Sequence, residues 1–135
     1  MPVADTEVLF ALNPRDPKHP HAIKTFQDLD NITVPDTSIL EFQTVLRGRG
    51  RSPAQVRNAL LAIHEVLRRF NVGENQTMSI RLLVLQCELE ERHDLTYFDS
   101  LIAASALTLG SRVVSDDKAF DKIPNLVRIS LCQGA

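Results

Sequence analysis

Short apolar segments alternate with longer helical segments along this chain, and that order constrains its fold more than any other feature. Because helical segments separate the apolar ones, each strand must be joined to the next by a long crossover rather than by a hairpin. Strands joined in this way form a parallel sheet covered by helices on both faces. We therefore predict an α/β protein with three layers, α/β/α. Its strands are expected at residues 2–4, 32–34, 113–115 and 126–129.

The helical segments carry start signals and apolar stripes. Ser38 and Glu41 match the S-x-x-E capping box, which predicts a helix that starts at Ser38. Apolar residues lie on nearly all sides of the first two turns of segment 80–89, which predicts a central helix. A short extended piece is expected at 70–72, with a turn over 73–76. Helices are expected at about 7–12, 21–29, 38–46, 53–70, 80–89 and 97–109.

The 135 residues are 44% hydrophobic and 24% charged, with a formal net charge of −2. This composition predicts a single domain over residues 1–135 and excludes a polybasic nucleic-acid binder, so any contact with nucleic acid must be local. The two cysteines share no metal-binding spacing with the histidines, and no segment is apolar for long enough to span a membrane. We expect an unprocessed cytoplasmic protein without membrane contact.

Four acidic residues occupy related positions. Asp5 and Asp117 come at or just after the carboxyl ends of predicted strands, whereas Glu41 and Asp99 lie in the first turns of predicted helices. In an open parallel sheet this rim is where ligands bind, so the four side chains can converge there. Each acid alone is also explained by helix capping, because carboxylates favour helix N-termini.

Gathered on one rim, these four carboxylates would repel one another and raise their own pKa values unless a cation neutralised them. Carboxylate oxygens, with no Cys or His in matching positions, select Mg²⁺ or Mn²⁺ over zinc. Such an ion can lower the pKa of a bound water, orient it for attack and offset charge on a phosphoryl group. The arrangement therefore predicts hydrolysis of a phosphoester.

Four segments carry a resemblance to a known family. The more specific are 97–104, Tyr-Phe-Asp-Ser-Leu-Ile-Ala-Ala, and 113–120, Val-Val-Ser-Asp-Asp-Lys-Ala-Phe, where an S-x-D-x-x-F pattern follows a short strand. Segments 3–6 and 40–42, Val-Ala-Asp-Thr and Leu-Glu-Phe, complete the set. Over nearly its whole length the chain resembles PIN-domain ribonucleases, close to the toxin component of VapBC-type toxin–antitoxin pairs.

The resemblance implies an endoribonuclease that cleaves RNA phosphodiester bonds with a metal-activated water and requires Mg²⁺ or Mn²⁺. It also implies a five-stranded parallel sheet, a homodimer and an antitoxin protein that blocks the site. The residues implied as catalytic groups and metal ligands are Asp5, Glu41, Asp99 and Asp117.

Neighbouring residues complete the site that the resemblance implies. Thr6 and Ser115 match its supporting hydroxyl residues. Asp116 is an alternative ligand to Asp117, although the spacing to Phe120 favours Asp117. Glu7 stands where the family often has serine, and it either adds an acid near the metal or points away.

The segment 47–51, Arg-Gly-Arg-Gly-Arg, concentrates positive charge directly after the predicted helix that carries Glu41. Guanidinium groups bind phosphates well, so Arg47, Arg49 and Arg51 are candidate RNA-binding residues. The same composition is equally typical of a solvated loop.

Two other functions stay open on the sequence alone. One is a catalytically silent PIN scaffold that acts as a binding module and keeps the acids only as helix caps. The other is a phosphotransfer-type α/β protein, a phosphatase or a receiver domain. Segment 5–7, Asp-Thr-Glu, lacks the D-x-D that the phosphatase needs, and no mid-chain strand presents a phosphoacceptor Asp. Both features make the phosphotransfer function the weaker alternative.

Overall fold

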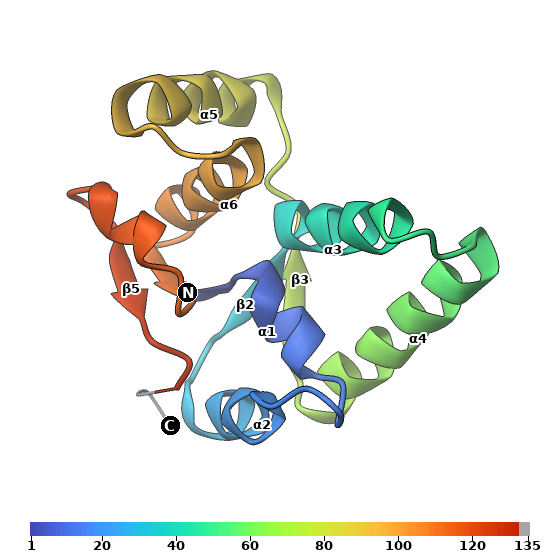
Figure 1. Cartoon of the computed structure of the whole chain (residues 1–135). Helices are drawn as coiled ribbons and strands as arrows, with labels where there is room; N and C mark the ends of the chain where they lie inside the picture. Colours follow the sequence, from blue (N-terminus) through green and yellow to red (C-terminus); the bar gives the residue numbers. More distant parts are fainter. Residues whose placement is uncertain (133–135) are drawn as a thin grey trace.

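The computed structural model describes residues 1–132, which build one five-stranded sheet with all strands parallel (Figure 1). The strand order is β3-β2-β1-β4-β5, so β1 lies at the centre. The predicted α/β/α fold with a five-stranded parallel sheet is confirmed. The single domain over 1–135 stays a prediction, and its last three residues lie outside the described part. The strands are β1 (Val3–Ala4), β2 (Thr33–Pro35), β3 (Gly73–Asn75), β4 (Arg112–Val114) and β5 (Val127–Ile129).

Neighbouring residues of the central strands point to opposite faces of the sheet, and each face has its own core. Val3 and Val113 are fully buried in one core, whereas Ala4 and Val114 are fully buried in the other. Helices α1 to α4 pack on the Ala4 side, and α5, α6 and the 3₁₀ helix η1 pack on the Val3 side (Figure 1). The helices are α1 (Thr6–Ala11), α2 (His19–Asp28), α3 (Asp36–Gly48), α4 (Pro53–Arg69), α5 (Ile80–His93), α6 (Tyr97–Thr108) and η1 (Lys118–Lys122).

The turn predicted over 73–76 was wrong, because strand β3 lies there and pairs in parallel with β2. The extended piece predicted at 70–72 is also wrong. Phe70 caps the end of α4, and Asn71 has a positive φ of 54° in the turn that follows. β3 pairs only with β2 at the sheet edge and its side chains are exposed or half-exposed, so no apolar pattern marks it.

The capping box predicted for Ser38 and Glu41 does not form, because α3 begins two residues earlier than predicted. β2 runs directly into α3, with Pro35 at the N-cap. Ser38 is fully buried, and its hydroxyl donates a hydrogen bond to the carbonyl of Ala4 at 2.7 Å. Glu41 instead accepts a hydrogen bond from the Thr6 hydroxyl. Both side chains are therefore used in contacts between distant segments.

Helix α5 lies in the outer layer, so the prediction that it is central was wrong. Leu82 and Leu89 are buried against α6, but Ile80 is 85% exposed and Val84 is 53% exposed. Helix α6 takes the central place, because its Ala and Ser side chains are small enough to let it lie close to the sheet (Figure 1). No helix within residues 1–132 is long and apolar enough to cross a membrane.

Candidate active site

Asp5 directly follows β1 and serves as the N-cap of α1. Its carboxylate accepts hydrogen bonds from the Thr6 N–H at 2.8 Å and from the Ser115 hydroxyl at 2.7 Å. Burial raises the pKa of Asp5 to about 7, and the negative charges of Glu7 and Asp99 add to this shift. The two hydrogen bonds oppose the shift without cancelling it. Asp5 is therefore a buried acid that ionises reluctantly.

Glu41 reaches the same region from the first half of α3. The Thr6 hydroxyl donates to its Oε1 atom, so the residue next to Asp5 also holds Glu41. Glu41 is half-buried, and burial is the main cause that raises its pKa. The charges of Asp99 and Asp117 raise this pKa further, while the hydrogen bond from Thr6 lowers it.

Asp99 lies in the first turn of α6, where Thr96 is the N-cap. The Asp99 N–H donates to the Thr96 hydroxyl at 3.3 Å, as the sequence predicts for a capped helix. Burial raises the pKa of the Asp99 carboxyl, and the negative charge of Asp117 raises it further. Thr96 and the positive charge of Lys122 act in the opposite direction.

Asp117 is the N-cap of η1, and its carboxylate accepts a hydrogen bond from the Ala119 N–H at 2.9 Å. The Asp117 N–H donates to the Ser115 hydroxyl at 2.9 Å, and that hydroxyl donates to Asp5. Ser115 thus connects two acids that come from the neighbouring strands β1 and β4.

The structure brings together the four acids singled out in the sequence. The charge of Asp99 raises the pKa values of Asp5 and Glu41. The charge of Asp117 raises those of Glu41 and Asp99. Hydrogen bonds connect Glu41 with Asp5 through Thr6, and Asp5 with the Asp117 backbone through Ser115. Together with these charge effects, they indicate that the four acids lie at one rim, at the carboxyl ends of β1 and β4. Their catalytic and metal-binding roles stay predictions.

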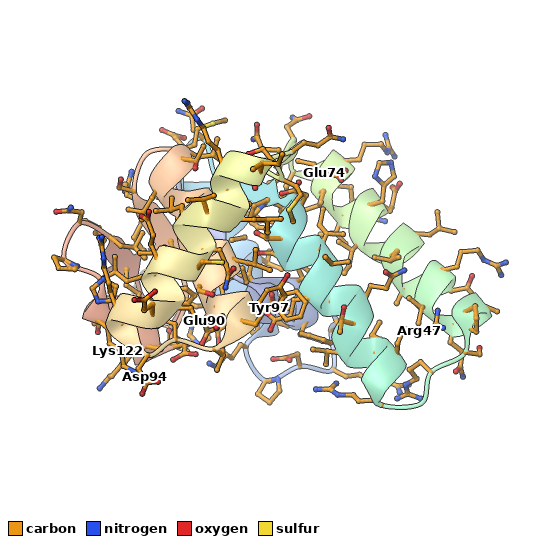
Figure 2. The ribbon with its side chains drawn as sticks, turned by 90° about the horizontal axis from the view of Figure 1, so that it is seen from above. Arg47, Glu74, Glu90, Asp94, Tyr97 and Lys122 are labelled. Carbon is orange, nitrogen blue, oxygen red and sulfur yellow. The ribbon has the colours of Figure 1, made fainter. Side chains whose placement is uncertain are left out.

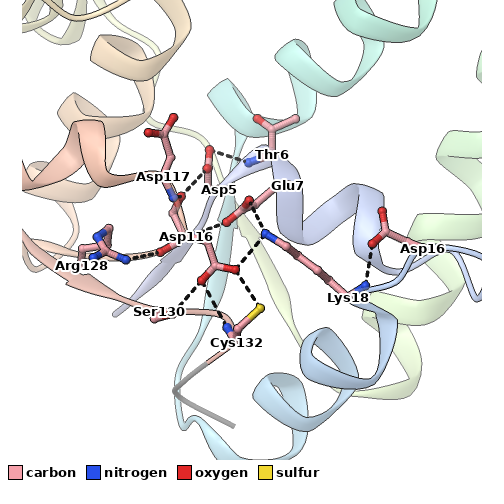
Figure 3. Close-up of polar contacts among 11 residues, drawn as sticks. Asp5, Thr6, Glu7, Asp16, Lys18, Asp116, Asp117, Arg128, Ser130 and Cys132 are labelled. Atoms are coloured by element: carbon pink, nitrogen blue, oxygen red, sulfur yellow. Dashed lines mark hydrogen bonds and ion pairs between the residues drawn. The ribbon is translucent and has the colours of Figure 1, made fainter.

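Asp116 points away from this rim, although it neighbours Asp117 (Figure 3). Its carboxylate accepts hydrogen bonds from Lys18 at 2.9 Å and Ser130 at 2.7 Å, and from the backbone and thiol of Cys132. Burial raises the pKa of Asp116, but these hydrogen bonds outweigh it and hold the pKa far below its usual range. Asp116 is therefore engaged elsewhere, and Asp117 faces the other acids.

The sequence did not predict that Glu7 and Lys18 contact the loop that holds Asp116. Glu7 accepts a hydrogen bond from the Asp116 N–H through Oε1, and its Oε2 lies 3.5 Å from the Lys18 Nζ. Lys18 lies in a polar loop 98 residues from Asp116, and no spacing in the sequence signals this contact.

The chemistry of these donors fits a divalent cation. All four acids offer hard oxygen ligands. Burial is the main cause that raises the pKa values of Asp5, Glu41 and Asp99, and the negative charges of neighbouring acids add to it, so a bound cation would favour their ionised forms. Among residues 1–132, however, no group of three or more His, Cys, Asp or Glu side chains is already arranged as a ligand cluster. The residues that would hold Mg²⁺ or Mn²⁺ are Asp5, Glu41, Asp99 and Asp117.

The three candidate RNA-binding arginines do not lie together. Arg49 lies over the Phe10 ring, 5.1 Å from its centroid, and it lines an apolar groove of about 780 Å³ with Arg51 and Arg69. This groove lies between α1, α2, α3 and α4. Arg47 lines a separate pocket between α3 and α4, and Figure 2 shows it far from the start of α6. The structure therefore groups two of the three arginines.

The raised pKa of Asp5 makes the stability of the metal-free protein depend on pH. An unperturbed aspartic acid has a pKa of 3.8, whereas Asp5 has a pKa of about 7 in the folded chain, so the folded state binds more protons between these values. Ionisation of Asp5 therefore destabilises the fold increasingly as pH rises from about 4 to about 7. We expect Asp5→Asn to gain unfolding free energy relative to wild type by about 1 kcal/mol or more over this range.

Urea unfolding in EDTA at a series of pH values measures this difference. Asp28→Asn is the matched control, because Asp28 is exposed on α2 and pairs only weakly with Lys24 at 3.8 Å. A difference between Asp5→Asn and wild type that does not change with pH would contradict the assignment.

Solved structures from several bacteria share this fold. The VapBC2 complex of Rickettsia felis, bound to a DNA fragment from its promoter, matches with a TM-score of 0.69 and 17% identity, covering 95% of this chain and 96% of that chain. VapC20 of Mycobacterium tuberculosis, a sarcin–ricin loop cleaving toxin, matches with a TM-score of 0.68 and 20% identity, covering 90% and 93%. VapBC-1 of nontypeable Haemophilus influenzae matches with a TM-score of 0.67 and 16% identity, covering 96% and 97%. At these identities the likeness establishes the fold alone.

No curated protein matches this chain. The family model of the PIN domain, in contrast, matches residues 3–126. This range runs from β1 through η1 and includes the four converging acids together with Thr6 and Ser115. The resemblance drawn from the sequence motifs is thereby confirmed, and the chain belongs to the PIN domain family.

Proposed function

We propose that this protein is a metal-dependent endoribonuclease and the toxin of a type II toxin–antitoxin pair, acting in the cytoplasm. The observation that carries the proposal is the convergence of four carboxylates from four elements on one rim. Membership of the PIN family supports a nuclease. The likeness to VapBC structures, which include a toxin that cleaves the sarcin–ricin loop, supports RNA as the substrate and a toxin as the role.

The residues of the rim have separate tasks in this proposal. Bound Mg²⁺ or Mn²⁺ would offset the clustered negative charge, activate water and stabilise charge on the phosphodiester. Asp5, Glu41 and Asp99 are the principal ligands, and Asp117 completes the site or orients water. Thr6 fixes the carboxylate of Glu41, while Ser115 fixes that of Asp5. The hydroxyl residues thus limit how far the acids can move apart.

Replacing Asp99 tests the catalytic proposal. Asp99→Asn keeps the size of the side chain but removes one negative charge from the rim, so we expect RNA cleavage with Mn²⁺ or Mg²⁺ to fall by about 100-fold or more. The rise in melting temperature caused by millimolar Mn²⁺ should shrink as well. Asp28→Asn should retain both properties. Cleavage that survives Asp99→Asn would point to a wrong site.

The alternative is a catalytically silent PIN scaffold that acts as a binding module. It is favoured by one observation, because Asp5 and Asp117 both serve as helix caps and thus have structural roles. Under this alternative, Mn²⁺ would not change the melting temperature of the wild-type protein, and a panel of structured RNAs would stay intact.

Arg49 and Arg51 are the proposed phosphate contacts. Arg49 lies eight residues after Glu41, which is about 12 Å along a helix axis, so one RNA strand can reach both regions. In the Asp99→Asn background, Arg51→Ala should weaken RNA binding and reduce the slope of log affinity against log salt by about 0.7. Fluorescence anisotropy with a labelled RNA measures both. Arg92→Ala, at the end of α5, should leave the slope unchanged; an equal change would rule out a local contact.

An antitoxin protein is the proposed regulatory partner. Support comes from the VapBC structures and from the apolar groove between α1, α2, α3 and α4. Phe10, Phe42 and Ile63 line this groove, and Arg49 and Arg51 stand among them. A partner segment with apolar and acidic side chains would match it, and would cover the two proposed phosphate contacts.

We also propose a homodimer that uses the outer face of α5. Ile80, Val84 and the preceding Met78 are exposed, and exposed apolar side chains grouped in this way favour association. The wild-type protein should then have twice the chain mass of 15.1 kDa in light scattering. Val84→Glu should reduce the mass to that of one chain, whereas Val127→Glu, on the exposed side of β5, should not. A wild-type monomer would contradict the dimer.

A further inference from the structure

Three charged side chains from three segments meet beside the carboxylate rim. Glu7 belongs to α1, Lys18 precedes α2, and Asp116 lies in the loop between β4 and η1. The Lys18 Nζ lies 2.9 Å from Asp116 Oδ2 and 3.5 Å from Glu7 Oε2 (Figure 3). We call these three residues the charge clamp. None of them is among the four acids of the rim.

The charge clamp fixes the backbone that presents Asp117. The N–H of Asp116 donates to Glu7, and the next N–H, that of Asp117, donates to the Ser115 hydroxyl. Ser115 in turn donates to Asp5. Two consecutive N–H groups, those of Asp116 and Asp117, therefore donate to side-chain acceptors. The first of these hydrogen bonds depends on the position of Glu7.

The Asp116 side chain also binds residues 130 and 132, near the end of the described chain. Its Oδ1 atom accepts from the Ser130 hydroxyl and from the Cys132 N–H, while Oδ2 accepts from Lys18. With both oxygens engaged, the Asp116 side chain is directed away from the rim. The neighbouring Asp117 side chain points the other way (Figure 3), and its charge acts on Glu41 and Asp99.

We propose that Lys18 and Glu7 are positioning residues, which hold the 115–117 loop so that Asp117 and Ser115 stay within reach of the other acids. The inference rests on the proposed function, because it assigns to the clamp the geometry of that same cation site. It adds two residues that contact neither the cation nor RNA in the proposal.

The three side chains of the charge clamp are partly exposed to solvent, so their effect on the cation site can be tested without unfolding the protein. The side chain of Lys18 is 39% exposed, and those of Glu7 and Asp116 are 29% and 18% exposed. Ion pairs that are partly exposed contribute little to the stability of the whole fold. Variants of Lys18 and Glu7 should therefore fold, and any effect on the cation site can be measured.

Charge alone and positioning predict opposite results for Lys18→Met. If Lys18 acted only through its positive charge, its removal would make the rim more negative and tighten Mn²⁺ binding. If Lys18 holds the loop, its removal lets Asp117 move away and weakens Mn²⁺ binding by about 10-fold or more, as for residues that orient metal ligands. Lys18→Arg keeps the charge and the ion pairs, and should restore binding close to the wild-type level.

The experiment is a calorimetric titration of the wild-type protein and its variants with Mn²⁺, combined with hydrogen exchange of the amides of residues 115–117. Lys18→Met should weaken Mn²⁺ binding and speed exchange at Asp116 and Asp117. Glu7→Met, which removes the acceptor of the Asp116 N–H, should speed the same exchange. RNA cleavage should lose kcat with little change in KM, because the clamp acts on Asp117 of the proposed cation site and not on the proposed phosphate contacts. Lys24→Met is the matched control, since Lys24 forms a weak pair with Asp28 on the surface of α2.

The outcomes distinguish this inference from the proposed function. Wild-type protein that binds no Mn²⁺ would overturn both. Wild-type protein whose Mn²⁺ binding depends on Asp99, together with a Lys18→Met variant that binds as tightly or more tightly, would overturn the clamp alone. Weakened binding without faster exchange at residues 116 and 117 would likewise overturn it.

Discussion

The parallel pairing of β1 with β4 at the centre of the sheet is the constraint on which the candidate site depends. Val3 lies opposite Val113, Ala4 lies opposite Val114, and the Asp5 N–H continues the ladder by donating to the Val114 carbonyl at 3.1 Å. Both strands therefore end at the same edge. Asp5 and the 115–117 loop must lie side by side there, whatever their own preferences as helix caps. The pairing of the strands determines where this rim lies, and helices α3 and α6 then add Glu41 and Asp99 to it.

The packing of α6 is the second requirement. Residues 101–106 of this helix are buried, and the small side chains of residues 103–106 let the helix lie close to β2 and β4. Hydrogen bonds among Thr37, Thr77 and Ser105 join it to α3 and to the loop between β3 and α5. This buried polar contact joins the first turn of α3 to the C-terminal half of α6. With the two helices packed together in this way, the charge of Asp99 acts on Glu41 and raises its pKa beyond the effect of burial.

Local patterns were enough to predict most of the fold and three of the four acids. Asp5, Asp99 and Asp117 follow strand or helix-start signals of a few residues, and the structure has each at that position. Glu41 was also selected, but its capping-box explanation failed, because the true start of α3 is set by β2. Strand β3 and the outer position of α5 depend on neighbours in space rather than on their own sequence. The contact of Lys18 with Asp116 spans 98 residues and lies beyond any local pattern.

The burial of the acids, to which their mutual repulsion adds, connects the stability of the fold with the proposed function. Burial raises the pKa of Asp5 to about 7, so ionisation of this carboxyl group lowers the free energy of unfolding. Any cation that binds the folded chain and not the unfolded one recovers that loss, so its binding must stabilise the fold. A rim selected for stability alone would replace at least one acid by a neutral side chain, because the hydrogen bonds of Thr6 and Ser115 need only an acceptor. The presence of all four acids in one place is therefore better explained by a ligand that needs them than by helix capping.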